Sequence, residues 1–337
     1  MTSAAYRPAT VGRGELLARL ESVLHTRGRA LLTGPAGVGK TEVALAVAAR
    51  AESRGERVLW LATLPADRNI PGAAAAALVA SVSASLSWPA PGAHEGLDAH
   101  AGAGGGEAPG GFDILEGLPG PQRSAVAMLC REAPIPELGW DPIALRLALA
   151  QILRTLAARG PVLLVVDGVQ RIDADSADLL RFALHLAPSA LRAVAVETPA
   201  AYGPDTPRTA SHGPDTPRTT VHGPDTPRAG EPKRDATDAE PLWVPSEADV
   251  LFVPPLHADE IAELLIHHRL PSRMAGRIHR ASGGNPRLAL AVGRSLADAR
   301  TPVHHAEALS LSGRARDLAR QLLDAASPGV RGTLLLA

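Results

Sequence analysis

The 337-residue sequence predicts an α/β fold in which helices wrap a parallel β-sheet. Short apolar stretches typical of buried strands alternate with longer segments whose apolar residues recur at helical spacing. A glycine-rich turn joins the first such strand to its helix, and a later strand ends on Asp167. This alternation is typical of parallel sheets, because each crossover needs a helix to return the chain. Ligands of such sheets bind at the carboxyl ends of the strands.

The expected elements follow one another along most of the chain. Strands are expected over Ala30–Thr33, Arg57–Ala62, Pro161–Asp167, Leu191–Glu197 and Val250–Val253. Helices are expected over Val11–Leu24, Thr41–Arg54, Pro71–Leu86, Pro142–Ala158, Ala177–Leu186, Asp259–His268, Arg273–Ala281 and Pro286–Leu296. Asp175 or Ser176 is expected to cap the helix over Ala177–Leu186.

The glycine-rich turn fits the phosphate-binding pattern G-x-x-x-x-G-K-[ST] at every fixed position. It reads Gly34-Pro35-Ala36-Gly37-Val38-Gly39-Lys40-Thr41. Between a strand and a helix, such a turn points several backbone N–H groups at one spot, where the helix dipole also favours an anion. Lys40 is then expected to reach the β- and γ-phosphates, and the Thr41 hydroxyl to ligate Mg²⁺. A chance glycine-rich turn is the alternative, and the flanking strand and helix count against it.

Asp167 follows five consecutive apolar residues and is expected at the carboxyl end of a central strand. That position suits an aspartate that holds the Mg²⁺ of a nucleotide, usually through water. The alternative is an ordinary turn aspartate after a core strand.

Composition favours a cytoplasmic protein of about two domains. Net charge is −1, so the segment has no overall electrostatic footprint for nucleic acid, and no apolar run approaches a membrane span. Cys130 is the one cysteine, which excludes an internal disulfide and suits a small buried apolar residue. The histidine pairs at 267–268 and 304–305 lack a cysteine or carboxylate at clear ligand spacing, so surface histidines are preferred to a metal site.

Two segments interrupt the pattern and are expected to be inserts. Residues 88–111 are rich in glycine and proline. In residues 199–245, Gly203-Pro204-Asp205-Thr206-Pro207-Arg208 recurs at 213–218 and 223–228, which predicts a disordered decapeptide repeat. A Pro-rich ligand for a partner is the alternative for that repeat. The apolar end of the sequence, after Ser327-Pro328, leads to the expectation that the chain is a fragment of a longer protein.

Several segments of the chain carry a family resemblance in their order and spacing. They are Val11-Gly12-Arg13, Gly34 to Thr41, Pro161 to Asp173 and Ser282-Gly283-Gly284-Asn285-Pro286, together with Leu118–Arg123 and Leu309–Leu336. In these the chain resembles large ATP-binding LuxR-type transcriptional regulators, which belong to the signal-transducing STAND class of P-loop ATPases. The resemblance implies a P-loop ATP-binding domain over 11–198 after a leader at 1–10, with the last strand of its sheet in 246–253. A helical lid domain over 254–312 and the start of a winged-helix region over 313–337 would follow.

The resemblance also implies roles for individual residues. Val11, Gly12 and Arg13 would line the adenine side, and Pro286 would approach the base or ribose from the lid. The residues from Gly34 to Thr41 would hold the phosphates, and Thr41 and Asp167 would hold Mg²⁺. DNA would be bound only through a C-terminal domain absent from this chain, while ATP or ADP would bind here; the oligomeric state is left open.

Two departures from the family pattern bear on catalysis. Gly168 stands where such proteins usually have a second acid, which normally orients the attacking water. Gln170, Asp173 and Glu197 are substitutes, although none has the expected position. The strand ending at Glu197 also runs directly into the repeat insert instead of ending in a polar or arginine sensor.

Two functions compete on these grounds. The favoured one is a regulatory ATP-binding switch of a LuxR-type transcriptional regulator that is at most a slow ATPase. The alternative is a catalytically active AAA-like ATPase that acts on DNA or protein assemblies, against which Gly168 and the near-neutral charge argue.

Overall fold

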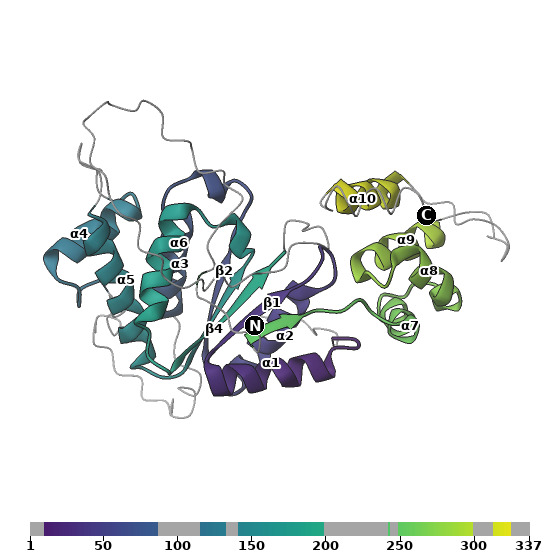
Figure 1. The fold of residues 1–337 in the computed structure, drawn as a ribbon, viewed down its shortest axis with the longest axis horizontal. Helices are drawn as coiled ribbons and strands as arrows, with labels where there is room; N and C mark the ends of the chain where they lie inside the picture. Colours follow the sequence, from purple (N-terminus) through teal and green to yellow (C-terminus); the bar gives the residue numbers. More distant parts are fainter. Residues whose placement is uncertain are drawn as a thin grey trace, which may run out of the picture.

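A parallel sheet between two layers of helices forms the larger part of the molecule, and a smaller group of helices lies to one side of it (Figure 1). The computed structural model describes residues 10–86, 115–132, 141–198, 242, 249–298 and 313–324. The expected α/β fold is therefore confirmed. Within the described ranges, no helix combines the length and the apolar character that a membrane crossing needs.

The elements agree closely with the sequence pattern. The strands are β1 (Arg29–Thr33), β2 (Arg57–Ala62), β3 (Val162–Asp167), β4 (Leu191–Glu197) and β5 (Val250–Phe252). The helices around the sheet are α1 (Gly14–Arg27), α2 (Lys40–Ser53), α3 (Ala73–Leu86), α4 (Gly120–Leu129), α5 (Pro142–Ala157) and α6 (Ala174–His185). The separate group contains α7 (Ala258–His267), α8 (Ala275–Ser282), α9 (Pro286–Asp298) and α10 (Gly313–Asp324).

The five strands lie in the order β2-β3-β4-β1-β5, and every pair is parallel. The chain thus crosses from β1 to the far edge of the sheet at β2, and then returns strand by strand through β3 and β4. Thr33 pairs with Glu197, and Asp167 pairs with Val196 and with Ala62. This register brings the ends of β1, β2, β3 and β4 to one edge of the sheet.

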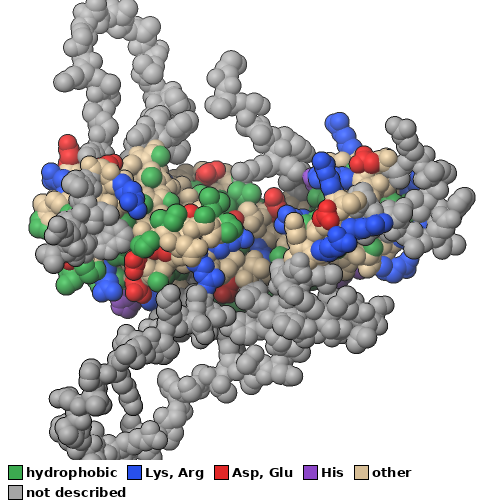
Figure 2. Space-filling view, turned by 90° about the horizontal axis from the view of Figure 1, so that it is seen from above, with side chains coloured by type: hydrophobic (Ala, Val, Ile, Leu, Met, Phe, Trp, Pro, Cys, Tyr) green, Lys and Arg blue, Asp and Glu red, His purple; other side chains and the backbone are tan. Residues whose placement is uncertain are grey.

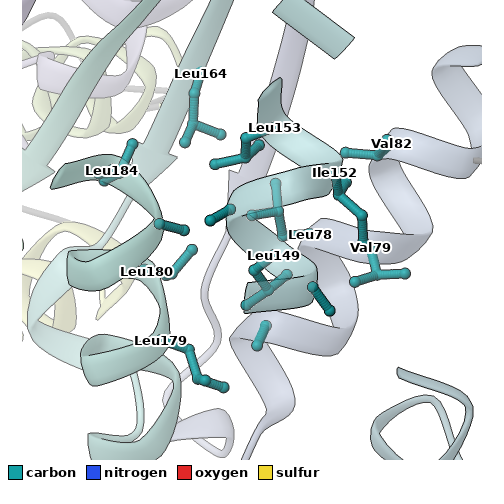
Figure 3. Packing of buried hydrophobic residues seen from close by; sticks show 14 of the residues in the cluster. Leu78, Val79, Val82, Leu149, Ile152, Leu153, Leu164, Leu179, Leu180 and Leu184 are labelled. Carbon is teal, nitrogen blue, oxygen red and sulfur yellow. The ribbon is translucent and has the colours of Figure 1, made fainter. Parts of the chain in front are cut away.

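Alternation along the strands divides the core into two layers. On β3, Leu164 and its alternate neighbours pack against α3, α4, α5 and α6, and Leu163 and Val165 pack against α1 and α2. Figure 3 shows the first layer, in which apolar side chains of α3, α5 and α6 pack together beneath Leu164. Because both faces are covered, β3 is a continuous apolar run up to Asp167.

The separate helices have their own small core. Leu256, Ile261, Leu265, Ile278 and Val292 are buried together there, and α10 packs on α9 through the buried Ala315. Lys and Arg side chains gather on this group in the view from above (Figure 2). Helices α7, α8 and α9 lie in the range 254–312 for which a helical lid is expected, and we use the name lid for these three helices below.

Three sequence-based expectations need correction or comment. Helix α6 begins at Ala174 rather than Ala177, and its cap is Asp173 rather than Asp175 or Ser176. Leu242 falls within the segment 199–245 that was expected to be disordered, yet it is buried in the α3–α6 layer, so that expectation is wrong for this residue. The other residues of both inserts, and the C-terminal apolar stretch, lie outside the described residues.

The carboxylate of Asp173 caps α6 and also accepts hydrogen bonds at the start of α3. It accepts hydrogen bonds from Ser176 N at 2.9 Å and Gly72 N at 2.8 Å, and from Ala74 N at 3.3 Å. Its side chain is almost wholly buried, so these backbone groups have no access to water as a replacement. Asp173 therefore ties the start of α6 to the start of α3.

Replacing Asp173 with alanine should lower the free energy of unfolding by about 2–4 kcal/mol, because a cap is lost and buried N–H groups lose their acceptor. Urea denaturation would measure the change. Asp178→Ala is the control on the same helix; its carboxylate pairs only at the surface with Arg181 and should contribute about 0–1 kcal/mol. Equal losses in the two variants would contradict the structural role assigned to Asp173.

Candidate functional site

The candidate site lies where the turn after β1 meets the end of β3. Glycine is required in this turn, because Gly37 and Gly39 have φ values of 80° and 97°. Gly39 caps α2, which then begins at Lys40. The predicted phosphate loop therefore has the expected local structure, in which a strand, a turn of left-handed glycines and a helix N-terminus follow in succession.

Lys40 lies within the loop and is mostly buried. Its ammonium group donates hydrogen bonds to the carbonyl oxygens of Gly34 and Pro35, both at 2.8 Å. Burial lowers the pKa of Lys40 from its ordinary value to about 8; Asp167 and Glu197 oppose this shift, whereas Arg171 adds to it. The amine is thus partly deprotonated just above neutral pH unless an anion comes close.

Thr41 and Asp167 meet although they are far apart in the sequence. The Thr41 hydroxyl donates to Asp167 Oδ2 at 3.0 Å. A hydroxyl and a carboxylate beside a phosphate loop are the oxygen ligands that Mg²⁺ uses together with water and nucleotide phosphates. No cluster of three or more His, Cys, Asp or Glu residues in the described ranges could hold a metal by itself. Thr41 and Asp167 are therefore the candidates for a nucleotide-linked Mg²⁺.

The segment Val11-Gly12-Arg13 lies between the phosphate loop and the lid. Arg13 is only 4% exposed, and its guanidinium donates to Val38 O at 3.1 Å. Burial lowers the pKa of Arg13, and the negative charge of Glu260 opposes that shift. At Gly12 a Cβ would lie 2.1 Å from Glu260 Oε1, so the glycine leaves room for a lid carboxylate.

The lid contacts the phosphate loop directly at the start of α9. Asn285 Nδ2 donates to Ala36 O at 2.8 Å, and the Arg287 N–H donates to Gly37 O at 3.3 Å. A Cβ on Gly37 would lie 2.8 Å from Asn285 Oδ1, so the glycine is also needed for this close approach. Pro286 opens α9 between these two contacts, as the sequence predicts. The loop is thus bonded to the lid through its backbone.

Gly168 is explained by its backbone conformation and by Thr63. Its φ is 86°, in the left-handed region that disfavours other residues. Thr63 Oγ1 lies 2.9 Å from Asp167 O and 2.6 Å from Gly168 O, and a Cβ on Gly168 would be only 2.7 Å from that hydroxyl. Thr63, which follows β2, therefore occupies the space that a second acidic side chain would enter.

The three candidate catalytic residues have different surroundings. Asp173 is engaged in capping α6, as described above. Gln170 Oε1 accepts from Thr198 N at 3.3 Å, which joins it to the end of β4. Glu197 ends β4 and is close enough for its charge to act on Lys40. Of the three, Glu197 is the carboxylate that remains beside the phosphate loop.

The sequence did not indicate Thr63 or Arg171 as residues of this site. Nor did it indicate that Asn285 contacts the loop. Thr63 follows a predicted strand directly, so its position at the sheet edge was available as a signal. Asn285 was noted only as part of the Gly-Gly-Asn-Pro segment. Its bond to Ala36 joins residues 249 positions apart, which no local pattern indicates.

Comparison with known proteins agrees with this geometry. A model of the AAA ATPase domain family matches residues 9–196. Among solved structures, the chain is similar to a Walker-type ATPase of Pyrococcus abyssi at 13% identity, with a TM-score of 0.46 and coverage of 97% of this chain and 75% of that chain. No curated protein matches. Because the family match spans more than half of the sequence, the chain belongs to the AAA ATPase domain family.

Proposed function

We propose that this chain is an ATP-binding switch module of a LuxR-type transcriptional regulator in which ATP hydrolysis is weak or absent. Membership of the AAA ATPase domain family supports nucleotide binding in general. The observation that carries the narrower proposal is the direct bonding of the lid to the phosphate loop, through Asn285 to Ala36 O and Arg287 N to Gly37 O. The sequence resemblance at residues 11–13 and 282–286 supports the regulator family.

ATP is proposed to bind with its phosphates on the loop from Gly34 to Thr41. Lys40 would neutralise the phosphate charge, and Thr41 and Asp167 would hold Mg²⁺ between them. Val11, Gly12 and Arg13 are proposed to lie on the adenine side, and Pro286 on the side of the base or ribose. Both sets belong to segments that contact the loop, which supports placing the nucleotide between the sheet and the lid.

Switching follows if ATP changes the contact between loop and lid. The nucleotide can shift the equilibrium between two lid arrangements only by its difference in affinity for them. Ala36 and Gly37 accept the lid hydrogen bonds and belong to the loop that would bind phosphate. Any adjustment of this loop around phosphate would therefore act directly on the Asn285 bond.

Slow hydrolysis follows from Gly168. Without an acid there, no carboxylate directly after Asp167 can orient a water molecule, and a general base contributes about 10²–10⁴ in rate. Glu197 beside Lys40 is the remaining substitute. A catalytically active ATPase that acts on DNA or protein assemblies is the alternative, and rapid turnover by the wild-type chain would favour it.

Gly168→Asp should hydrolyse ATP faster than Gly168→Asn, by about 10²-fold if the missing acid limits the rate. The two side chains have the same shape and tolerate left-handed backbone similarly, so both meet Thr63 equally and differ only in the carboxylate. Single-turnover rates of ATP hydrolysis by both variants would be compared with the rate of the wild type. Lys40→Ala would give the background rate without a functional phosphate loop. Fast turnover in the wild type, or equal rates in the Asp and Asn variants, would count against the proposal.

The affinity for ATP should fall as pH rises through about 8. Burial favours the neutral Lys40 amine, so the free site loses its ammonium charge above that pH, whereas phosphate favours the charged form. Binding should therefore take up protons above pH 8, and affinity should decrease by at most about tenfold per pH unit. Calorimetry in buffers of different ionisation enthalpy would measure the proton uptake. Lys40→Arg, which stays charged, should show no such pH dependence. A wild-type ATP affinity that does not change with pH would contradict this prediction.

Asn285→Asp should reduce the effect of ATP on the lid. Aspartate keeps the oxygen that accepts from Leu288 N and caps α9, but it removes the Nδ2 donor and places a carboxylate beside Ala36 O. Hydrogen exchange of α8 and α9 with and without Mg·ATP would measure the coupling. Coupling between two sites typically changes a binding affinity about 5–150-fold. His268→Ala, at the exposed residue that follows α7, is the control. A nucleotide effect of wild-type size in Asn285→Asp would show that the coupling uses another route.

A further inference from the structure

Arg171 lies at the same sheet edge as the phosphate loop. It ends the short turn Val169–Arg171 that follows β3, and its N–H donates to Gly168 O at 2.8 Å. Its guanidinium donates to Thr63 O at 3.4 Å, and its Cδ would be 3.7 Å from a Cβ on Gly168. The side chain therefore runs along the carboxyl ends of β2 and β3, beside Asp167.

The hydrogen bonding of Arg171 is weak for a guanidinium. Among the described residues, the long bond to Thr63 O is the one hydrogen bond that its side chain makes. Other exposed arginines, such as Arg50 and Arg54, donate to carboxylates at 2.8–2.9 Å. Arg171 is exposed and has a positive charge that is close enough to act on Lys40.

Two cations beside one another disfavour each other unless an anion lies between them. Lys40 and Arg171 approach the same region from the loop after β1 and from the turn after β3. Asp167 bonds to Thr41, and its negative charge, with that of Glu197, acts on Lys40. Among the described residues no ion pair joins Asp167 to Arg171, so the guanidinium has no carboxylate partner of its own. A triphosphate accounts for this arrangement, because its terminal phosphate lies near the lysine of the loop and accepts the paired donors of a guanidinium.

We propose that Arg171 is a positioning residue that contacts the terminal phosphate of ATP from within the same chain and so distinguishes ATP from ADP. This inference rests on the proposed binding of ATP at the loop from Gly34 to Thr41. It gives the site a way to sense the third phosphate without a second acid at residue 168. A purely structural Arg171, which only joins β2 to β3 through Thr63 O, would stabilise both nucleotide complexes equally.

The test compares ATP and ADP affinities, each with Mg²⁺, in the whole chain. Arg171→Ala should lower the ratio of ATP affinity to ADP affinity by about tenfold or more, since a hydrogen bond to a charged group is lost only with ATP. Arg171→Lys keeps the charge without the paired donors and should lie between the wild type and Arg171→Ala. Arg154→Ala is the control, because Arg154 is an exposed arginine of α5 that bonds to Gln151 and lies toward the opposite end of β3.

A second measurement separates phosphate sensing from stability. ADP with beryllium fluoride, which mimics the terminal phosphoryl group, should raise the melting temperature of the wild type above its value with ADP alone. This extra rise should disappear in Arg171→Ala, while the melting temperature without nucleotide stays near the wild-type value. Equal weakening of ATP and ADP, or an unchanged affinity ratio, would overturn the role of Arg171 alone. A wild-type chain that binds neither nucleotide would overturn the proposed function as well.

Discussion

The pairing of β4 with both β1 and β3 fixes the position of the phosphate loop relative to Asp167. Because all three strands are parallel and in register, the turn after β1 and the carboxylate after β3 end at one edge of the sheet. The 3.0 Å contact between Thr41 and Asp167 is possible only through this register. A slip by one residue would also take Asp167 out of register with Val196 and Ala62, so the register of β3 sets the geometry of the site.

The phosphate loop is held from two sides by groups outside the sheet. Arg13 donates to Val38 O on one side, and Asn285 donates to Ala36 O on the other. Both bonds are made to backbone carbonyl oxygens, so neither of them uses a loop N–H group that could bind an anion. The loop is therefore the common neighbour of the N-terminal segment, the sheet and the lid, and this position is what a switch requires.

Local patterns in the sequence were sufficient for much of this arrangement. The run of apolar residues before Asp167 predicted β3 and its orientation, and the turn from Gly34 to Thr41 predicted the strand, the glycines and the start of α2. Strand order was beyond such patterns, because alternation shows that a strand is buried and not which strand lies beside it. The positions of Thr63 and Arg171 in the site depend on contacts between residues more than 100 positions apart. Thr63 bonds to Asp167 O, and Arg171 bonds to Thr63 O. The cap of α6 was placed wrongly for a related reason, since Asp173 also serves the N–H groups of Gly72 and Ala74.

Glu260 lies beside Gly12, and its charge acts on Arg13, which bears on how the chain divides into domains. Arg13 is a nearly inaccessible cation, and the carboxylate that opposes the effect of burial on it belongs to α7, on the lid. Separating the lid from the sheet would leave this cation without that counter-charge and Ala36 without its hydrogen-bond donor. These two interactions cross the sequence boundary near residue 254 and couple the lid to the sheet, although each has an apolar core of its own.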